Sequence, residues 1–198
     1  MSGSGLFGGS RNVLLGIVRL ATGRADGLVQ FGDSSQAFLG SLAPLIAFPL
    51  VGGGLMLAEG KGLSALGEML ATFCALLAPP VLSYWLARLW GRETLWLRFA
   101  TAFNWCQWAI PVAAAALLLL AGLLMRLGLS NTVAGTVVVL GLMGYGLWLH
   151  WFVARKGLQL SAVRSVLLVL LVNLGTAVLV GGPGLLALGV GSAVHTTG

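Results

Sequence analysis

Two charged side chains, Glu68 and Arg126, lie within or at the edge of long apolar stretches of this 198-residue chain. Glu68 is near the outer end of the second stretch, and Arg126 ends the third stretch at a comparable depth. Charges inside a bilayer are costly unless they are paired or hydrated. We therefore expect a structural ion pair between them, or a Glu68 carboxylate that reaches the outer water. A role in handling protons or cations is the alternative.

Three amide side chains form the second group that could do chemistry. Asn104 and Gln107 precede Pro111, and Asn173 lies alone in the last apolar stretch. Pro111 lacks an N–H and so frees the backbone carbonyl of Gln107, which a nearby amide or a water could satisfy. Interhelical hydrogen bonds, worth about 0.6–2 kcal/mol each, are the expected role of these amides. If the amides faced one cavity, they would instead form a polar track.

The histidines and cysteines predict no metal, cofactor or catalytic site. His150 and His195 fall at opposite ends of the predicted bundle and cannot share one metal or haem. Cys74 and Cys106 lack partners at metal-binding spacing and are expected to be small buried hydrophobes. No motif points to an enzyme. His150 is expected in an aromatic belt, and binding of a pigment by this single imidazole is the alternative.

The elements that must position these residues are helices that cross a membrane. The chain is 58% hydrophobic and only 8% charged, which excludes an ordinary soluble domain. A bilayer core of about 30 Å requires about 20 apolar residues in a helix. Five segments meet or nearly meet this length: 37–58, 63–87, 99–125, 132–154 and 161–180. The predicted fold is therefore an all-α membrane protein, a five-transmembrane-helix bundle over residues 37–180.

The flanking regions complete the predicted organisation. Residues 1–36 are expected to form a cytoplasmic segment with an amphipathic interfacial helix over 10–22, in which Leu14, Ile17, Val18 and Ala21 follow helical spacing. A flexible tail that becomes ordered only against the rest of the protein is the alternative. Residues 25–36 are expected to be a polar connection. Residues 181–198 form a Gly-rich outer tail, which could extend the last helix weakly.

The basic residues predict the orientation of this bundle. Nine of the eleven Lys and Arg residues flank the segments on one side, and only Lys61 and Arg126 lie on the other. This asymmetry predicts a cytoplasmic N-terminus and a C-terminus on the far side. The net charge of +6 then needs anionic lipid headgroups as partners, and no nucleic acid. The expected cytoplasmic anchors are Arg88, Arg92, Arg98, Arg155 and Lys156.

The tryptophans predict the same orientation. All seven fall in the halves of three segments that the charge pattern assigns to the cytoplasmic side. Tryptophan favours the headgroup level, so these residues form a one-sided aromatic belt. Trp105 and Trp108 lie deeper and are expected between helices. The predicted belt consists of Trp85, Trp90, Trp96, Trp148 and Trp151.

Glycine and proline predict close packing and bends. Gly141, Gly144 and Gly146 give the fourth segment an edge that suits a neighbouring helix, either internal or from another subunit. The prolines of the first three segments bend them and expose backbone groups. Transporters use such breaks for binding sites. Helix-packing shape alone also produces them, and no inverted repeat is visible.

Three short stretches resemble a known family. They are residues 86–92 (LARLWGR), residues 103–105 (FNW), and residues 151–155 (WFVAR) followed by Gly157 and Leu158. With the basic N-terminus and five segments, the chain over about residues 10–180 resembles small bacterial members of the Yip-domain superfamily. Eukaryotic members of that superfamily bind Rab-type GTPases through a longer cytoplasmic N-terminal region. The resemblance implies a non-enzymatic membrane organiser and supplies no catalytic residues.

These observations lead to one expected function and two alternatives. We expect a multi-pass protein of a bacterial inner membrane, with a periplasmic C-terminus, that acts as a scaffold or accessory subunit of a larger complex. Its partners are the bilayer and a membrane protein or a second copy. A small transporter or channel using Glu68, Asn104, Gln107 and Asn173 is the first alternative. A pigment- or haem-associated subunit of an energy-transducing complex is the second.

Overall fold

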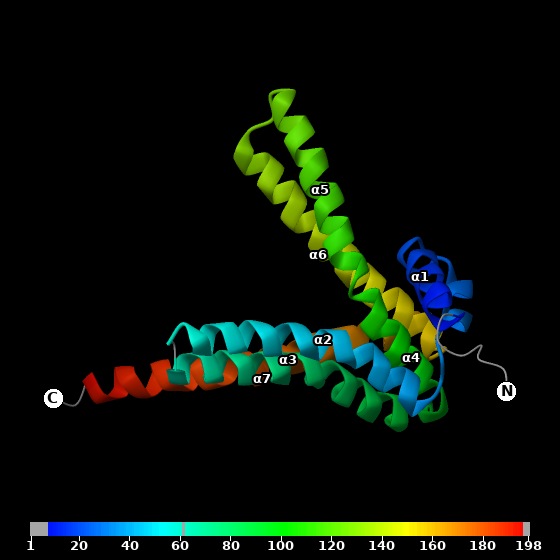
Figure 1. Cartoon of the computed structure of the whole chain (residues 1–198), viewed down its shortest axis with the longest axis horizontal. Coiled ribbons are helices and arrows are strands. Elements are labelled where there is room, and N and C mark those ends of the chain that lie inside the picture. The colour runs from blue at the N-terminus through cyan, green and yellow to red at the C-terminus, as the bar shows by residue number, and fades with distance from the viewer. Residues whose placement is uncertain (1–7, 61, 196–198) are drawn as a thin grey trace. The chain divides into compact units, whose positions relative to one another are not determined.

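The computed structural model describes residues 8–60 and 62–195, and these residues fold into helices joined by short connections (Figure 1). Each long helix follows a continuous apolar run, as expected where the backbone must satisfy its own hydrogen bonds. The elements are α1 (Gly8–Ala21), the 3₁₀ helix η1 (Ala25–Gln30), α2 (Ser35–Ala58), α3 (Gly62–Leu89), α4 (Glu93–Cys106), α5 (Ala109–Arg126), α6 (Asn131–Gly157) and α7 (Ala162–His195).

Five helical stretches of the described chain are long and apolar enough to cross a membrane. This confirms the all-helical class and the number of apolar segments that the sequence predicts. The stretches are Ser35–Ala58, Leu66–Leu89, Glu93–Arg126, Asn131–Gly157 and Ala162–Gly181.

Two boundaries differ from the predictions. The connection expected over residues 25–36 contains the short helix η1. The third segment is two helices, because α4 ends at Cys106 and α5 begins at Ala109. The last helix continues through residues 181–195, which agrees with the extension that was the alternative to a separate outer tail, because α7 ends only at His195.

The chain divides into two compact units. The first unit comprises Met1–Ser41 and Arg92–Val169, and the second comprises Leu42–Gly91 and Leu170–Gly198. All of α4, α5 and α6 therefore belong to the first unit, with the beginnings of α2 and α7.

Helix α6 is the central element of the first unit. Its first half pairs with α5 in a hairpin, where a Cβ on Gly141 would lie 3.4 Å from a methyl group of Leu117. Its second half packs against α4, and a Cβ on Gly157 would lie 3.0 Å from the Phe99 ring. At 27 residues α6 is about 40 Å long, which exceeds a bilayer core of about 30 Å.

The base of the first unit is formed by α1 and η1 beside α4 and α6. Gly27 lets η1 approach α1 closely, because a Cβ there would lie 2.8 Å from the Gly16 carbonyl oxygen. The Tyr145 hydroxyl of α6 donates a hydrogen bond of 3.2 Å to the carbonyl of Ala21, the last residue of α1. Leu20 is fully buried, whereas Leu14 and Val18 are exposed. Helix α1 thus packs through one side and presents an apolar face on the other.

The second unit is built from α3 and the neighbouring parts of α2 and α7. Glycines allow close approach on both sides of α3. A Cβ on Gly53 of α2 would lie 2.8 Å from the Met69 sulfur, and one on Gly175 of α7 would lie 2.7 Å from a Leu82 methyl group. Both contacts pair a glycine with a long apolar side chain, so helix packing in this unit depends on small residues.

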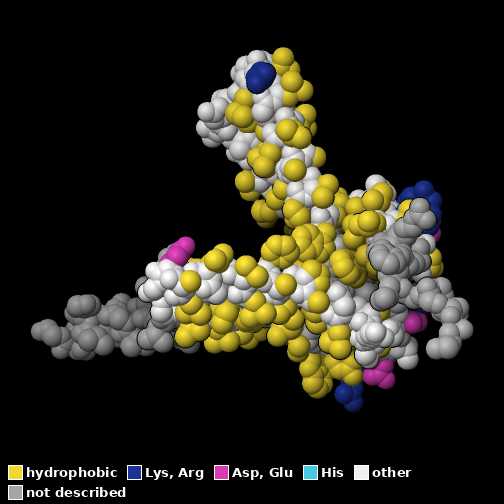
Figure 2. Space-filling model, in the orientation of Figure 1, with side chains coloured by type: hydrophobic (Ala, Val, Ile, Leu, Met, Phe, Trp, Pro, Cys, Tyr) yellow, Lys and Arg dark blue, Asp and Glu magenta, His cyan; other side chains and the backbone are white. Residues whose placement is uncertain are grey.

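Apolar side chains cover much of the surface of these helices (Figure 2). Within the five spanning windows, between 11% and 22% of the residues are buried inside the chain. An exposed apolar surface of this extent is typical of helices that contact lipid or other membrane helices.

Candidate functional site

The Asn104 side chain is buried and takes part in a short hydrogen-bonded relay. Its Nδ2 donates to Oγ of Ser41 at 3.0 Å, and the Ser41 hydroxyl donates to the Phe38 carbonyl at 2.6 Å. Asn104 is 3% exposed and Ser41 is fully buried. The relay joins α4 to the beginning of α2 inside the first unit. Asn104 thus makes the interhelical hydrogen bond that was expected of it.

The carbonyl freed by Pro111 has a different partner from those expected. The Gln107 carbonyl accepts a hydrogen bond from the Ile110 N–H at 3.2 Å. This is an i→i+3 bond of the 3₁₀ type, which commonly tightens a helix end. The backbone itself therefore satisfies this carbonyl, at the break between α4 and α5.

The remaining polar candidates are distributed over both units. Glu68 is exposed on α3, and Asn173 is exposed on α7, both in the second unit. Arg126 is exposed at the end of α5 in the first unit. The Glu68–Arg126 ion pair and the polar track both stay predictions, and Asn104 is already engaged by Ser41.

His150 of α6 lies against an aromatic ring of α4, and its expected place in the aromatic belt stays a prediction. Its ring centroid is 4.7 Å from that of Phe103. Its Nε2 atom is buried and has no hydrogen-bond partner among the described residues. Cys106 is buried as expected, whereas Cys74 is exposed, and both are free thiols. In the part of the chain that the structure describes, no group of three or more His, Cys, Asp or Glu side chains could hold a metal.

Several of the predicted belt and anchor residues contact one another. The guanidinium of Arg155 lies 5.2 Å from the Trp151 ring centroid, and that of Arg88 lies 5.9 Å from the Trp85 ring. Such cation–π contacts are favourable at a surface. Trp96 packs against Phe38 and Trp148 against Phe152, with centroids 5.1 and 5.5 Å apart. Trp90 and Arg92 are half-buried near the start of α4.

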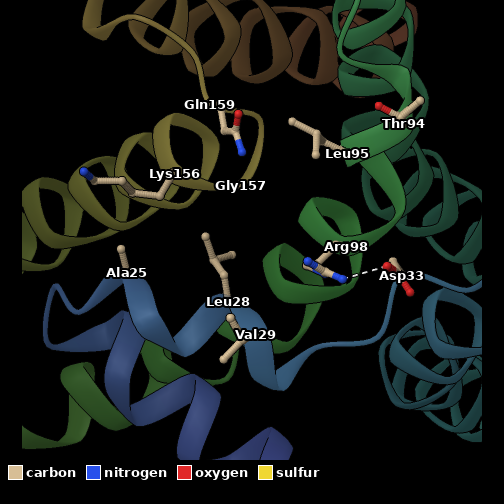
Figure 3. Close-up of a pocket in the computed structure, with 10 residues that line it drawn as sticks. All are labelled: Ala25, Leu28, Val29, Asp33, Thr94, Leu95, Arg98, Lys156, Gly157 and Gln159. Carbon is tan, nitrogen blue, oxygen red and sulfur yellow. Dashed lines mark hydrogen bonds and ion pairs between the residues drawn. The ribbon is translucent and has the colours of Figure 1, made fainter.

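A cavity of about 310 Å³ lies at the base of the first unit (Figure 3). Arg98 of α4 and Lys156 of α6 line it, and Arg98 donates to the Asp33 carboxylate at 2.6 Å. Lys156 is exposed and forms no ion pair with a described residue. Two cations against one carboxylate give the lining a net charge of +1.

The rest of the lining combines apolar and amide groups. Leu28 and Val29 of η1 and Leu95 of α4 border the cavity together with the Gln159 side chain. Figure 3 shows the Gln159 amide directed from the end of α6 toward the space between α4 and η1. Val29 is 72% exposed, so the opening carries an apolar residue. The cavity therefore offers cationic, amide and apolar groups within one space.

Sequence reasoning identified Arg98 and Lys156 only as general anchors and missed the cavity. Its formation depends on η1, which was not predicted, and on the absence of a side chain at Gly157, where Phe99 approaches α6. An acidic residue in the first turn is a usual signal of a helix start, and Asp26 has that position in η1, where it pairs with Arg19 and Arg24 at 3.3 and 3.1 Å.

No family model, no curated protein and no solved structure matches the chain.

Proposed function

We propose that the protein is a multi-pass protein of a bacterial inner membrane that acts, without enzymatic activity, as a scaffold or accessory subunit of a membrane complex. The five apolar helices support the membrane location. The predicted orientation, with the N-terminus cytoplasmic and the C-terminus periplasmic, follows from the basic residues. In the first unit, Arg155 and Lys156 end α6, whereas Arg126 stands at the opposite end of the α5–α6 hairpin. Membership of the Yip-domain superfamily stays a prediction.

The observation that carries the scaffold proposal is the outer face of α6. This face turns away from the contact between Gly141 and α5, and it presents Leu140, Met143 and Leu147 at 62%, 59% and 45% exposure. Gly144 lies among them, and a Cβ there would meet nothing within 4 Å. A glycine surrounded by exposed apolar side chains lets a second helix approach the backbone closely. The outer face of α6 is therefore the surface we assign to a partner helix.

Site-specific photo-crosslinking tests this assignment in cells. A photoreactive phenylalanine analogue replaces Leu140 on the outer face of α6. In the matched control, the same analogue replaces Leu117, which faces α6 from α5. We expect a protein adduct of one discrete mass from position 140 and none from position 117. Only lipid adducts, or crosslinks within the same chain, at position 140 would refute the assignment.

A pair of glycine variants sharpens the same experiment. Gly144→Leu fills the open space on the outer face and is expected to reduce the adduct about fivefold or more, which corresponds to about 1 kcal/mol of helix association. Gly122→Leu is the matched control on α5, where a Cβ also meets nothing within 4 Å. The control should leave the adduct yield unchanged. An equal loss in both variants would indicate a general effect on insertion or folding.

The transporter alternative has less support from the geometry. It requires intramembrane polar groups that are available to a solute, and Asn104 already donates its amide to Ser41 in a buried relay. If Glu68→Gln abolished ion or solute flux in proteoliposomes, this alternative would replace the scaffold proposal.

A further inference from the structure

The C-terminal end of α6 carries a glutamine at a position where glycine is usual. Gln159 has φ of +52°, and the Leu160 N–H donates to the Arg155 carbonyl at 3.1 Å. This six-residue bond around a left-handed residue is the Schellman arrangement, which favours glycine at the left-handed position. A side chain in this conformation costs about 1 kcal/mol or more.

The chain follows the glycine rule at two comparable helix ends. After α1, Gly23 has φ of +82° and the Arg24 N–H donates to the Arg19 carbonyl. After α5, Gly128 has φ of +99° and the Leu129 N–H donates to the Leu124 carbonyl. Of the helix ends after α1, α5 and α6, only the end of α6 has a left-handed residue that lines the cavity. Only at that end is the left-handed residue not a glycine.

The charges of the cavity point to the class of its ligand. Arg98 holds Asp33, whereas the exposed Lys156 has no carboxylate partner among the described residues. The lysine stem is flexible and its three N–H donors can rotate toward a bound group. The net charge of +1 matches a singly charged phosphodiester, and the Gln159 amide can donate to one of its oxygens.

The apolar part of the lining distinguishes a lipid from a free anion. Leu28, Leu95 and the exposed Val29 lie beside the cationic groups and would contact the hydrocarbon next to a headgroup. Basic pockets between membrane helices bind acidic headgroups in this way. A soluble phosphate would leave these three side chains without a role.

We propose that this cavity binds the phosphodiester headgroup of an acidic phospholipid, with Lys156 and Arg98 neutralising the phosphate and Gln159 donating to it. This site is independent of the partner surface on α6. Lipid binding should persist in the Gly144→Leu variant even if the scaffold proposal fails.

Lipid titration of the full-length protein in a zwitterionic detergent tests the proposal. The probe is a short-chain fluorescent phosphatidylglycerol, with phosphatidylcholine as the neutral competitor. Lys156→Gln is expected to weaken binding about fivefold, as for the loss of one cation near a headgroup. Arg164→Gln removes the same charge from an exposed site outside the cavity and should change the affinity by less than about twofold.

Two further variants separate binding from folding. Asp33→Asn raises the charge of the lining and should tighten binding, because Arg98 no longer shares its guanidinium with a carboxylate. Gln159→Gly removes the amide donor, so it should weaken lipid binding. It also relieves the left-handed strain, so the protein should become more resistant to unfolding. A purely structural glutamine would not give this opposite response.

The outcomes that overturn the proposal are specific. Equal losses in Lys156→Gln and Arg164→Gln would indicate diffuse surface attraction instead of a site. If the affinity for phosphatidylglycerol were unchanged in all the cavity variants, the cavity would be excluded as the lipid-binding site. Displacement of the lipid by millimolar inorganic phosphate would reassign the cavity to a soluble phosphate anion.

Discussion

Asn104 on α4 donates a hydrogen bond of 3.0 Å to the hydroxyl of Ser41 on α2, and both side chains are buried. The Ser41 hydroxyl in turn donates a hydrogen bond to the Phe38 carbonyl, one turn earlier on its own helix. Close by, Trp96 packs against Phe38 and Arg98 pairs with Asp33. The start of α2 is therefore held to α4 by polar, aromatic and ionic contacts.

Removing the Asn104 amide should destabilise the first unit. We expect Asn104→Ala to lower the free energy of unfolding by about 1 kcal/mol, because an interhelical hydrogen bond in a low-dielectric interior is lost. A double-mutant cycle that combines Asn104→Ala with Ser41→Ala measures the coupling between the two side chains. Circular dichroism monitors unfolding as SDS is titrated into each variant. We expect a coupling of about 0.5–1.5 kcal/mol.

Thr101 provides the control for this cycle. It is also buried on α4, but its hydroxyl donates to the Leu97 carbonyl of the same helix. Thr101→Val should therefore show no coupling to Ser41→Ala. A coupling as large as that of Asn104 would mean that the cycle reports general packing of α4.

Pro111→Ala should straighten the break between α4 and α5. The alanine regains an N–H for the Gln107 carbonyl, which now accepts from Ile110 in a tight turn. Spin labels at positions 94 and 119 would then move toward the about 38 Å expected for 25 residues of continuous α-helix. Pulsed electron paramagnetic resonance measures this distance.

A label pair at positions 112 and 119, within α5 alone, is the control for the proline variant. This distance should stay the same in both proteins, because α5 is already a continuous helix. If the 94–119 distance also stayed the same, contacts around α4 rather than Pro111 would be holding the break.

Gly141 and Gly144 should respond differently to the same substitution. Gly141 faces Leu117 of α5, so Gly141→Leu is expected to cost about 1–3 kcal/mol through overpacking of the hairpin. Gly144 faces open space, so Gly144→Leu should leave the unfolding free energy within about 0.5 kcal/mol. Unfolding in SDS measures both, and equal losses would contradict the placement of α5 against one side of α6.

Ser130 and Ser161 offer a matched test of topology. Each is an exposed residue at the start of a helix whose hydroxyl accepts a backbone N–H, from Val133 and Arg164 respectively. The 27 residues of α6 that separate them are long enough to cross a bilayer. With Cys74 and Cys106 replaced by alanine, Ser130→Cys should react with an impermeant maleimide in intact cells.

Ser161→Cys should react only after the membrane is permeabilised. Labelling of both positions from the same side would refute the crossing of the membrane by α6. The opposite pattern, with Ser161→Cys labelled in intact cells, would invert the orientation predicted from the basic residues.

The long helices could be predicted from the sequence because their apolar runs meet or nearly meet the length that a helix needs to cross the bilayer core. The break between α4 and α5 could have been placed more exactly from Pro111, because the ring removes the N–H that the Gln107 carbonyl would otherwise accept from. Pro44, Pro49, Pro79 and Pro80 show why that inference does not generalise, since α2 and α3 continue through them.

The cavity could not be predicted, because its lining comes from three places in the sequence. Asp33 and Arg98 are 65 residues apart, and only the folded base brings them into contact. Close approaches at Gly27 and Gly157 shape this region, and a glycine in a sequence does not reveal what will approach it. The strain at Gln159 is likewise a property of the backbone rather than of the residue pattern.

The hydrogen bond between the Tyr145 hydroxyl and the Ala21 carbonyl links the last turn of α1 to the middle of α6. If α6 tilts when a partner binds its outer face, this bond transmits the tilt to the N-terminal segment. A dye on the exposed side of α1 would then report binding at α6, which makes the first helix an indicator of the state of the sixth.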